Sequence, residues 1–146
     1  MKLKYPIKYP FLFTIGGIIY YLIEILWRGY SYFSMFILGG LCFLLIGLVN
    51  EYYFFKSPLL FQQLVACITI TLMEFSFGLI FNVVLGLDLW DYSKNSYNLM
   101  GQICLKYSIF WFFLSLPAIL LYDYLNYLLF GGKKTSVPVN LRFYLM

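Results

Sequence analysis

Four long apolar segments dominate this chain, at residues 11–27, 32–49, 59–87 and 103–130. A helix that crosses a bilayer needs roughly 17–25 predominantly apolar residues, so each segment can span one. A soluble domain of this size could not bury so much apolar sequence, and only 11% of the residues are charged. The sequence therefore predicts an all-α integral membrane protein, a four-transmembrane-helix bundle that forms a single domain over residues 1–146.

The basic residues predict how the bundle is oriented, because lysine and arginine concentrate in cytoplasmic segments. Three lie on the side of the 88–100 loop: Arg28, Lys94 and Lys106. Seven lie on the other side: Lys2, Lys4, Lys8, Lys56, Lys133, Lys134 and Arg142. Both termini are therefore predicted to be cytoplasmic, with the 88–100 loop outside.

Aromatic residues make up 23% of the chain, and many tyrosines and tryptophans fall at the ends of the predicted spans. Such positions are typical of an anchoring belt at the lipid headgroups. An aromatic box for a cationic ligand is the alternative. Asp123 lies among tyrosines late in the fourth span and is predicted to sit at the cytoplasmic interface. Pro117 is predicted to bend that span, because proline removes a helical hydrogen bond.

Glu24 and Glu74 are the most informative residues, because an ionisable group inside a span normally faces the bundle interior or a water-filled cavity. Each lies about 14 residues into its span, roughly 20 Å along a helix. Helical periodicity places each glutamate in an inward stripe of small and polar residues. The two stripes are predicted to face each other across the first and third helices.

Two basic residues are candidate partners for these glutamates. Arg28 follows Glu24 by four residues, which is the favoured order for a helical ion pair. Lys106, near the start of the fourth span, is the candidate for Glu74. Such pairs could serve packing alone, or the carboxylates could form a proton- or cation-binding site.

The two halves of the chain show a possible parallel repeat of two helices each. Each half opens with a glutamate-bearing segment and later has a small-residue cluster before a cysteine, at 39–42 and 101–104. Chance matching in a biased composition is the competing explanation.

Several function classes are excluded or disfavoured. The chain has no histidine, which removes histidine-dependent triads and metal sites, and its three cysteines form no metal-binding spacing. No nucleophile–base pair is visible, so we predict no catalytic residues, no enzyme activity, no metal and no cofactor. The basic residues form no stripe that would bind nucleic acid.

The 88–100 loop is the longest polar stretch. Trp90 is predicted to lie at the headgroups, and Asp91 is a good turn former that could also contact a ligand. Ser96 or Asn98 could cap the fourth helix. Two acids, Asp88 and Asp91, make only a weak metal signal.

A family resemblance is carried by this loop and the helix after it. The sequence reads Trp-Asp-Tyr-Ser at 90–93 and Asn-Leu-Met-Gly-Gln-Ile-Cys at 98–104. These motifs, with Glu74 in Leu-Met-Glu-Phe and Glu24 in Leu-Ile-Glu-Ile, resemble the family labelled "putative ABC-transporter type IV", or CmpB-like. The chain reads Gly-Gly-Leu-Cys at 39–42 where that family tends to show Gly-Pro-x-Cys. The resemblance implies a small multi-pass bacterial membrane protein connected with transport.

These observations predict a transporter or permease component of the bacterial plasma membrane. Its candidate substrate- or ion-binding residues are Glu24, Arg28, Glu74, Lys106, Asp91 and Trp90. The alternative is a structural or assembly subunit that does not itself transport. Four spans leave little interior space for a translocation pathway within a single protomer. We therefore expect a homo-oligomer or a partner membrane subunit in the lipid bilayer. No phosphate-binding loop motif occurs, so any ATP-driven role would need a separate ATPase.

Overall fold

The computed structural model describes residues 5–54 and 56–131. Four α-helices are long and apolar enough to cross a membrane. They are α1 (Tyr5–Arg28), α2 (Phe33–Val49), α3 (Leu59–Phe77) and α4 (Leu105–Phe130). Two π-helical segments extend α2 and α3, namely η1 (Asn50–Phe54) and η2 (Gly78–Val84), and two short strands, β1 (Asn98–Leu99) and β2 (Ile103–Cys104), precede α4.

The predicted four-helix architecture is confirmed, with shifts at the helix ends. α1 begins well before the apolar segment, because Pro6 falls in its first turn, where a missing N–H costs nothing. Pro10 lies further inside α1, and its carbonyl accepts a hydrogen bond from the Thr14 hydroxyl at 2.8 Å. α4 begins at Leu105 rather than 103, because residues 103 and 104 pair with β1 as a strand.

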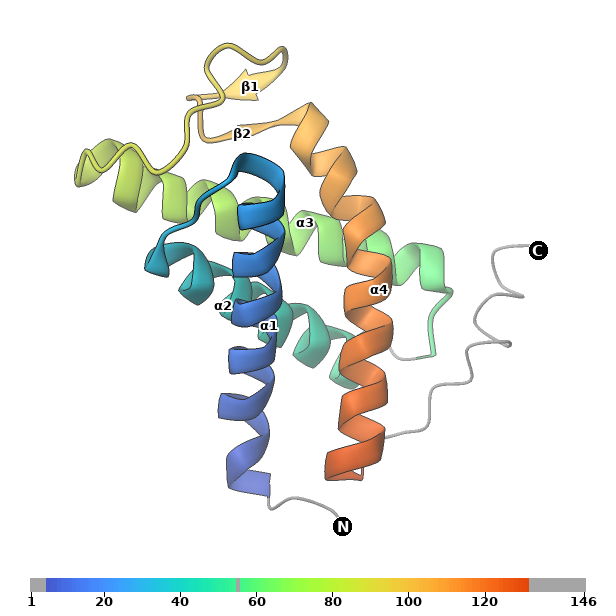
Figure 1. Ribbon diagram of the computed structural model, residues 1–146. Coiled ribbons are helices and arrows are strands. Elements are labelled where there is room, and N and C mark those ends of the chain that lie inside the picture. The colour runs from blue at the N-terminus through green and yellow to red at the C-terminus, as the bar shows by residue number, and fades with distance from the viewer. Residues whose placement is uncertain (1–4, 55, 132–146) are drawn as a thin grey trace.

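The helices form two hairpins, in which α1 packs mainly on α2 and α4 mainly on α3 (Figure 1). Glycine allows the first hairpin to close. A Cβ atom at Gly40 would lie 2.7 Å from the carbonyl oxygen of Phe13 in α1. Small residues of this kind let membrane helices approach backbone to backbone. This grouping is compatible with the two-helix repeat, which stays a prediction.

In front of the α2–α3 layer, α1 and α4 stand side by side and run in opposite directions (Figure 1). The start of α1 and the end of α4 share one end of the bundle, which we call the terminal end. Residues 85–104 cover the opposite end, which we call the loop end. Of the basic residues predicted to be cytoplasmic, only Lys8 and Lys56 are described; the other five lie outside the described residues.

Hydrogen bonds from the end of α3 fix the fold of the loop. Asn82, in η2, donates to the Gln102 side chain at 2.9 Å and accepts from the backbone N–H of Leu89 at 2.6 Å. Trp90 is only 8% exposed, and its indole N–H donates to the Gln102 carbonyl at 2.9 Å. The loop thus folds back over the Trp90 side chain, while its position relative to the headgroups stays a prediction.

The predicted cap of α4 is wrong. Asn98 accepts from the Gly101 N–H at 3.0 Å within the strand turn. The helix starts only after Cys104, and none of the described side chains caps it.

Candidate functional site

Glu74 is the centre of the candidate site. It lies in α3, is 3% exposed, and accepts hydrogen bonds from the Tyr92 hydroxyl at 2.8 Å and the Trp111 indole N–H at 2.9 Å. These donors come from the loop and from α4, so one carboxylate joins three parts of the chain. Among the described residues, no basic side chain pairs with Glu74.

The rest of the polar stripe on α3 packs against α4. Gln63 donates to the Phe112 carbonyl at 3.0 Å, and Cys67 donates to the Ser108 carbonyl at 3.1 Å. The Thr71 hydroxyl lies 3.2 Å from the Ser108 hydroxyl. Helical periodicity therefore identified the inward face correctly, but α4 rather than α1 supplies most of its partners.

Glu24 lies near the loop end of α1. Its carboxylate accepts from the Tyr20 hydroxyl at 3.2 Å and pairs with the Arg28 guanidinium at 2.6 Å. This confirms the ion pair predicted from the spacing of four residues.

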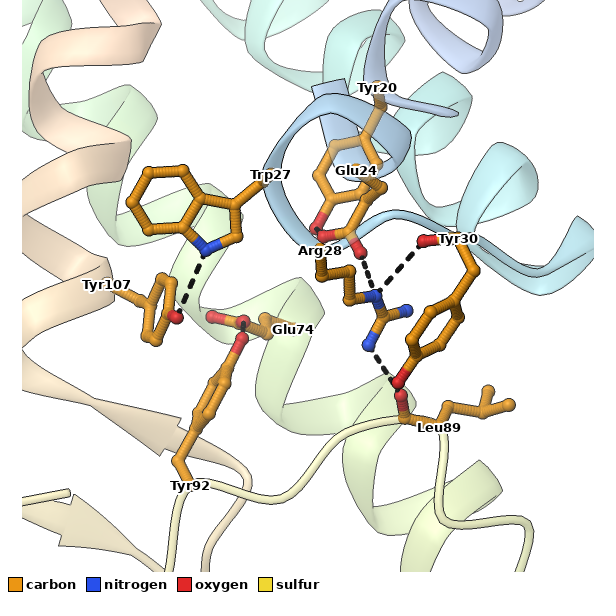
Figure 2. A network of polar contacts seen from close by, with 9 residues as sticks. All are labelled: Tyr20, Glu24, Trp27, Arg28, Tyr30, Glu74, Leu89, Tyr92 and Tyr107. Atoms are coloured by element: carbon orange, nitrogen blue, oxygen red, sulfur yellow. Dashed lines mark hydrogen bonds and ion pairs between the residues drawn. The ribbon is translucent and has the colours of Figure 1, made fainter. Parts of the chain in front are cut away.

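Arg28 also ties α1 to the loop. Its guanidinium donates to the Leu89 carbonyl at 2.9 Å and lies over the Tyr30 ring, 4.7 Å from the centroid (Figure 2). Cation–π contact and hydrogen bonds together hold this side chain in place. Arg28 therefore positions the loop as well as balancing the charge of Glu24.

Lys106 and Asp91 lie apart from the buried carboxylates. Lys106 is exposed, with its ammonium 5.7 Å from the centroid of the Tyr107 ring, and it does not make the predicted pair with Glu74. Asp91 accepts from the Ser93 N–H at 2.9 Å, and this hydrogen bond lowers the pKa of Asp91 below its usual value. Both residues act within the loop end rather than at Glu74.

Tyr92 is the contact that brings the loop into the membrane-spanning site. Burial and the negative charge of Glu74 raise the pKa of Tyr92 above its ordinary value, so its hydroxyl stays protonated and donates. The Tyr92 ring stacks on Tyr107 with centroids 4.6 Å apart. The Tyr107 hydroxyl in turn accepts from the Trp27 indole N–H at 3.4 Å (Figure 2).

These aromatic side chains line a cavity of about 410 Å³ at the loop end between α1 and α4. We call it the loop-end chamber. Its other lining residues include one carboxylate and the proline of α4; the full lining is Ile23, Glu24, Trp27, Tyr92, Tyr107, Phe110, Trp111, Phe113, Leu114 and Pro117. The sequence predicted a site between the first and third helices, whereas the chamber lies between the first and fourth.

The described residues contain no group of three or more Cys, Asp or Glu side chains that could hold a metal ion. Cys42, Cys67 and Cys104 are free thiols.

Sequence reasoning missed a second buried polar cluster, at the terminal end. Lys8 of α1 is 1% exposed and pairs with both oxygens of Glu51, at 3.1 and 3.2 Å. Tyr122 of α4 donates to the same carboxylate at 3.3 Å. Asn50 donates to Asp123 at 3.4 Å. Asp123 is buried within the protein, and its predicted place at the headgroup interface stays a prediction.

A signal for this cluster was present in the sequence. Lys8 and Glu51 lie at the same predicted membrane side, one before the first span and one after the second. The positive-inside rule accounts for Lys8 as an orientation signal alone, and this interpretation gives no reason to look for a carboxylate partner.

Comparison with known proteins places the chain in a family. A family model described as "Putative ABC-transporter type IV" matches residues 11–138. Neither a curated protein nor a solved structure matches the chain. Since the family match covers nearly all of the four helices, this multi-pass membrane protein belongs to the family described as "Putative ABC-transporter type IV".

Proposed function

We propose that this protein is a membrane-embedded transport component of the bacterial plasma membrane, and that Glu74 and Glu24 form its substrate- or ion-binding site. The observation that carries the proposal is that Glu74 is a buried carboxylate with two neutral hydrogen-bond donors. Both donors, Tyr92 and Trp111, line the loop-end chamber. An intramembrane acid beside a cavity is the usual arrangement for binding a proton or cation.

The loop-end chamber has a suitable size for a small ligand. Ligand pockets are commonly about 300–1,000 Å³, lined mainly by apolar and aromatic groups with a few polar ones. The chamber of about 410 Å³ falls in this range and has one carboxylate, that of Glu24, in its wall. Any ATP hydrolysis would come from a separate ATPase subunit, because the chain has no phosphate-binding loop motif.

The competing function is a structural or assembly subunit. The observation in its favour is that Glu24 pairs with Arg28 inside the same helix, while Glu74 joins α3, α4 and the loop. On this reading the carboxylates fasten helices, and the cavity is filled by lipid or by a partner helix.

Currents from proteoliposomes on a solid-supported membrane separate the two functions. Wild-type protein would be challenged in turn with an acid step, potassium and tetraphenylphosphonium, with empty liposomes as the baseline. We expect at least one current that Glu74→Gln abolishes. Asp88→Asn is the matched control, because Asp88 is exposed in the loop and asparagine tolerates its positive φ of 49°.

Two results would count against transport. Wild-type currents no larger than those of empty liposomes would overturn the proposal. So would currents that Glu74→Gln leaves unchanged while size-exclusion chromatography shows that the variant is folded.

A further inference from the structure

The loop-end chamber adjoins a second cavity, which is also lined by α1 and α4. The second cavity has a volume of about 250 Å³, and we call it the mid-bundle chamber. Four residues line both chambers: Ile23, Trp111, Leu114 and Pro117. From Gly16 to Trp27 the lining of α1 covers roughly 16 Å at about 1.5 Å per residue. The two chambers therefore lie next to each other along α1, and we refer to them together as the elongated site.

The two chambers differ in chemistry. The loop-end chamber contains the Glu24 carboxylate and the polar aromatic residues Trp27, Tyr92 and Tyr107. The mid-bundle chamber is lined almost wholly by apolar groups, among them Ile19, Phe43, Ile46, Ile70, Ala118 and Leu121. Within residues 5–54 and 56–131, no basic side chain lines either chamber. The elongated site is thus polar and acidic at one end and apolar at the other.

The charge near the loop-end chamber favours a cation. Arg28 pairs with Glu24, whereas the Glu74 carboxylate has no basic partner among the described residues. Glu74 accepts hydrogen bonds from Tyr92 and Trp111, and both of these side chains line the chamber. Aromatic rings attract cations through their quadrupoles, and a nearby carboxylate in a medium of low dielectric strengthens that attraction.

The site opens on the outer surface of the bundle. Trp27 is 63% exposed and Phe113 is 66% exposed, although both line the loop-end chamber. In a bilayer this surface faces lipid, so an amphiphile could reach the chamber sideways from the membrane.

We infer that the elongated site binds an amphiphilic organic cation, with its charged head in the loop-end chamber and its apolar chain in the mid-bundle chamber. This inference rests on the proposed binding role of Glu74 and names the class of ligand.

Charge recognition is tested with two ions of the same shape. Radiolabelled tetraphenylphosphonium would be equilibrated with the protein in nanodiscs, and protein-free nanodiscs would give the background. We expect saturable binding that unlabelled tetraphenylphosphonium displaces and the anion tetraphenylborate does not. Trp27→Leu and Glu74→Gln should each weaken binding about tenfold, because each removes one source of cation attraction. Phe33→Leu is the matched control, since Phe33 is exposed and lines neither chamber.

Recognition of the ligand's alkyl chain is tested with methyl- and decyltriphenylphosphonium as competitors. The result for each compound is corrected for its partition into protein-free nanodiscs. The decyl compound should displace the label at a concentration about tenfold lower. Ala118→Phe, which fills the mid-bundle chamber, should remove this advantage and leave the methyl compound unaffected.

Binding of tetraphenylborate as tight as that of tetraphenylphosphonium would overturn the inference, as would no saturable binding of either ion. If cation binding fails while a current that depends on Glu74 persists, the ligand class is wrong and the proposed transport function stands. If Ala118→Phe weakens the binding of the methyl and decyl compounds equally, the placement of the ligand's alkyl chain in the mid-bundle chamber is overturned.

Discussion

At the terminal end of the bundle, the ammonium of Lys8 contacts both oxygens of Glu51, and Tyr122 of α4 adds a third contact. At the loop end, Glu74 is more deeply buried than Glu51, and among the described residues its donors are the neutral side chains of Tyr92 and Trp111. The first carboxylate has its charge balanced by another helix and lines neither chamber. The second has no basic partner among the described residues, and its donors line a cavity of about 410 Å³. The same residue type can therefore fasten helices at one end and be available for binding at the other.

The largest expected effect comes from breaking the ion pair at the terminal end. Lys8→Ala should lower the free energy of unfolding by about 3 kcal/mol, because it leaves Glu51 with an unbalanced charge in a buried cluster. Unfolding by sodium dodecyl sulfate in mixed micelles measures this loss. The double variant Lys8→Met with Glu51→Gln should recover most of it, since no charge is then left unpaired. A single variant as stable as the wild type would show that the pair does not hold the helices.

Tight packing should make the terminal end sensitive to added volume. A Cβ atom at Gly47 would overlap the ring of Tyr122, a side chain that is wholly buried. Gly47→Ala should therefore cost about 2 kcal/mol, although alanine favours the helix itself. Thermal unfolding in detergent checks the loss. In a Tyr122→Leu background, Gly47→Ala should lower the stability less than it does in the wild type. An equal loss of stability in both backgrounds would contradict the explanation that alanine overlaps the Tyr122 ring.

Glu74→Gln should have a smaller effect on stability, of about 1 kcal/mol. Glutamine still accepts one of the two hydrogen bonds, and the substitution leaves no cation unpaired. The same unfolding assay measures it beside Lys8→Ala. A loss as large as that of Lys8→Ala would mean that both ends serve the fold, which would favour the assembly subunit over the transport component.

The smallest effect concerns the loop and its dependence on pH. The folded-state pKa of Asp91 is lowered by the hydrogen bond from the Ser93 N–H, so its contribution to loop stability is present above the unfolded pKa. That contribution is lost as the pH falls below about 4. Hydrogen exchange of the Ser93 amide should therefore show weaker protection in acid. In Asp91→Asn the protection should change less with pH, and an identical pH profile would contradict this role.

Much of the fold could be predicted because hydrophobic length and periodicity are local signals. The four helices, the inward position of Glu74 and the Glu24–Arg28 pair all follow from spacing along one segment. The contacts of Lys8 with Glu51 and of Glu74 with Trp111 join residues that are far apart in sequence. Such pairings depend on how the helices pack against one another. The sequence of one segment alone does not determine that packing.

The role of the aromatic side chains also could not be predicted from the sequence alone. A belt at the headgroups and a box around a cation use the same residue types, so composition alone could not separate them. The hydrogen bond between Tyr92 and Glu74 holds one of these side chains in the wall of the loop-end chamber. A tertiary contact, rather than the position of Tyr92 in the sequence, sets its environment.

The hydrogen bonds of Glu74 also bear on how the chain is made. Its donors follow it by 18 and 37 residues, so both leave the ribosome after Glu74 does. A carboxylate that enters lipid alone costs about 3 kcal/mol on insertion scales. Because α4 and the loop relieve this cost, α3 should remain beside the insertion machinery until the rest of its hairpin has emerged. The contact that defines the site thus couples the last half of the chain into one unit of membrane insertion.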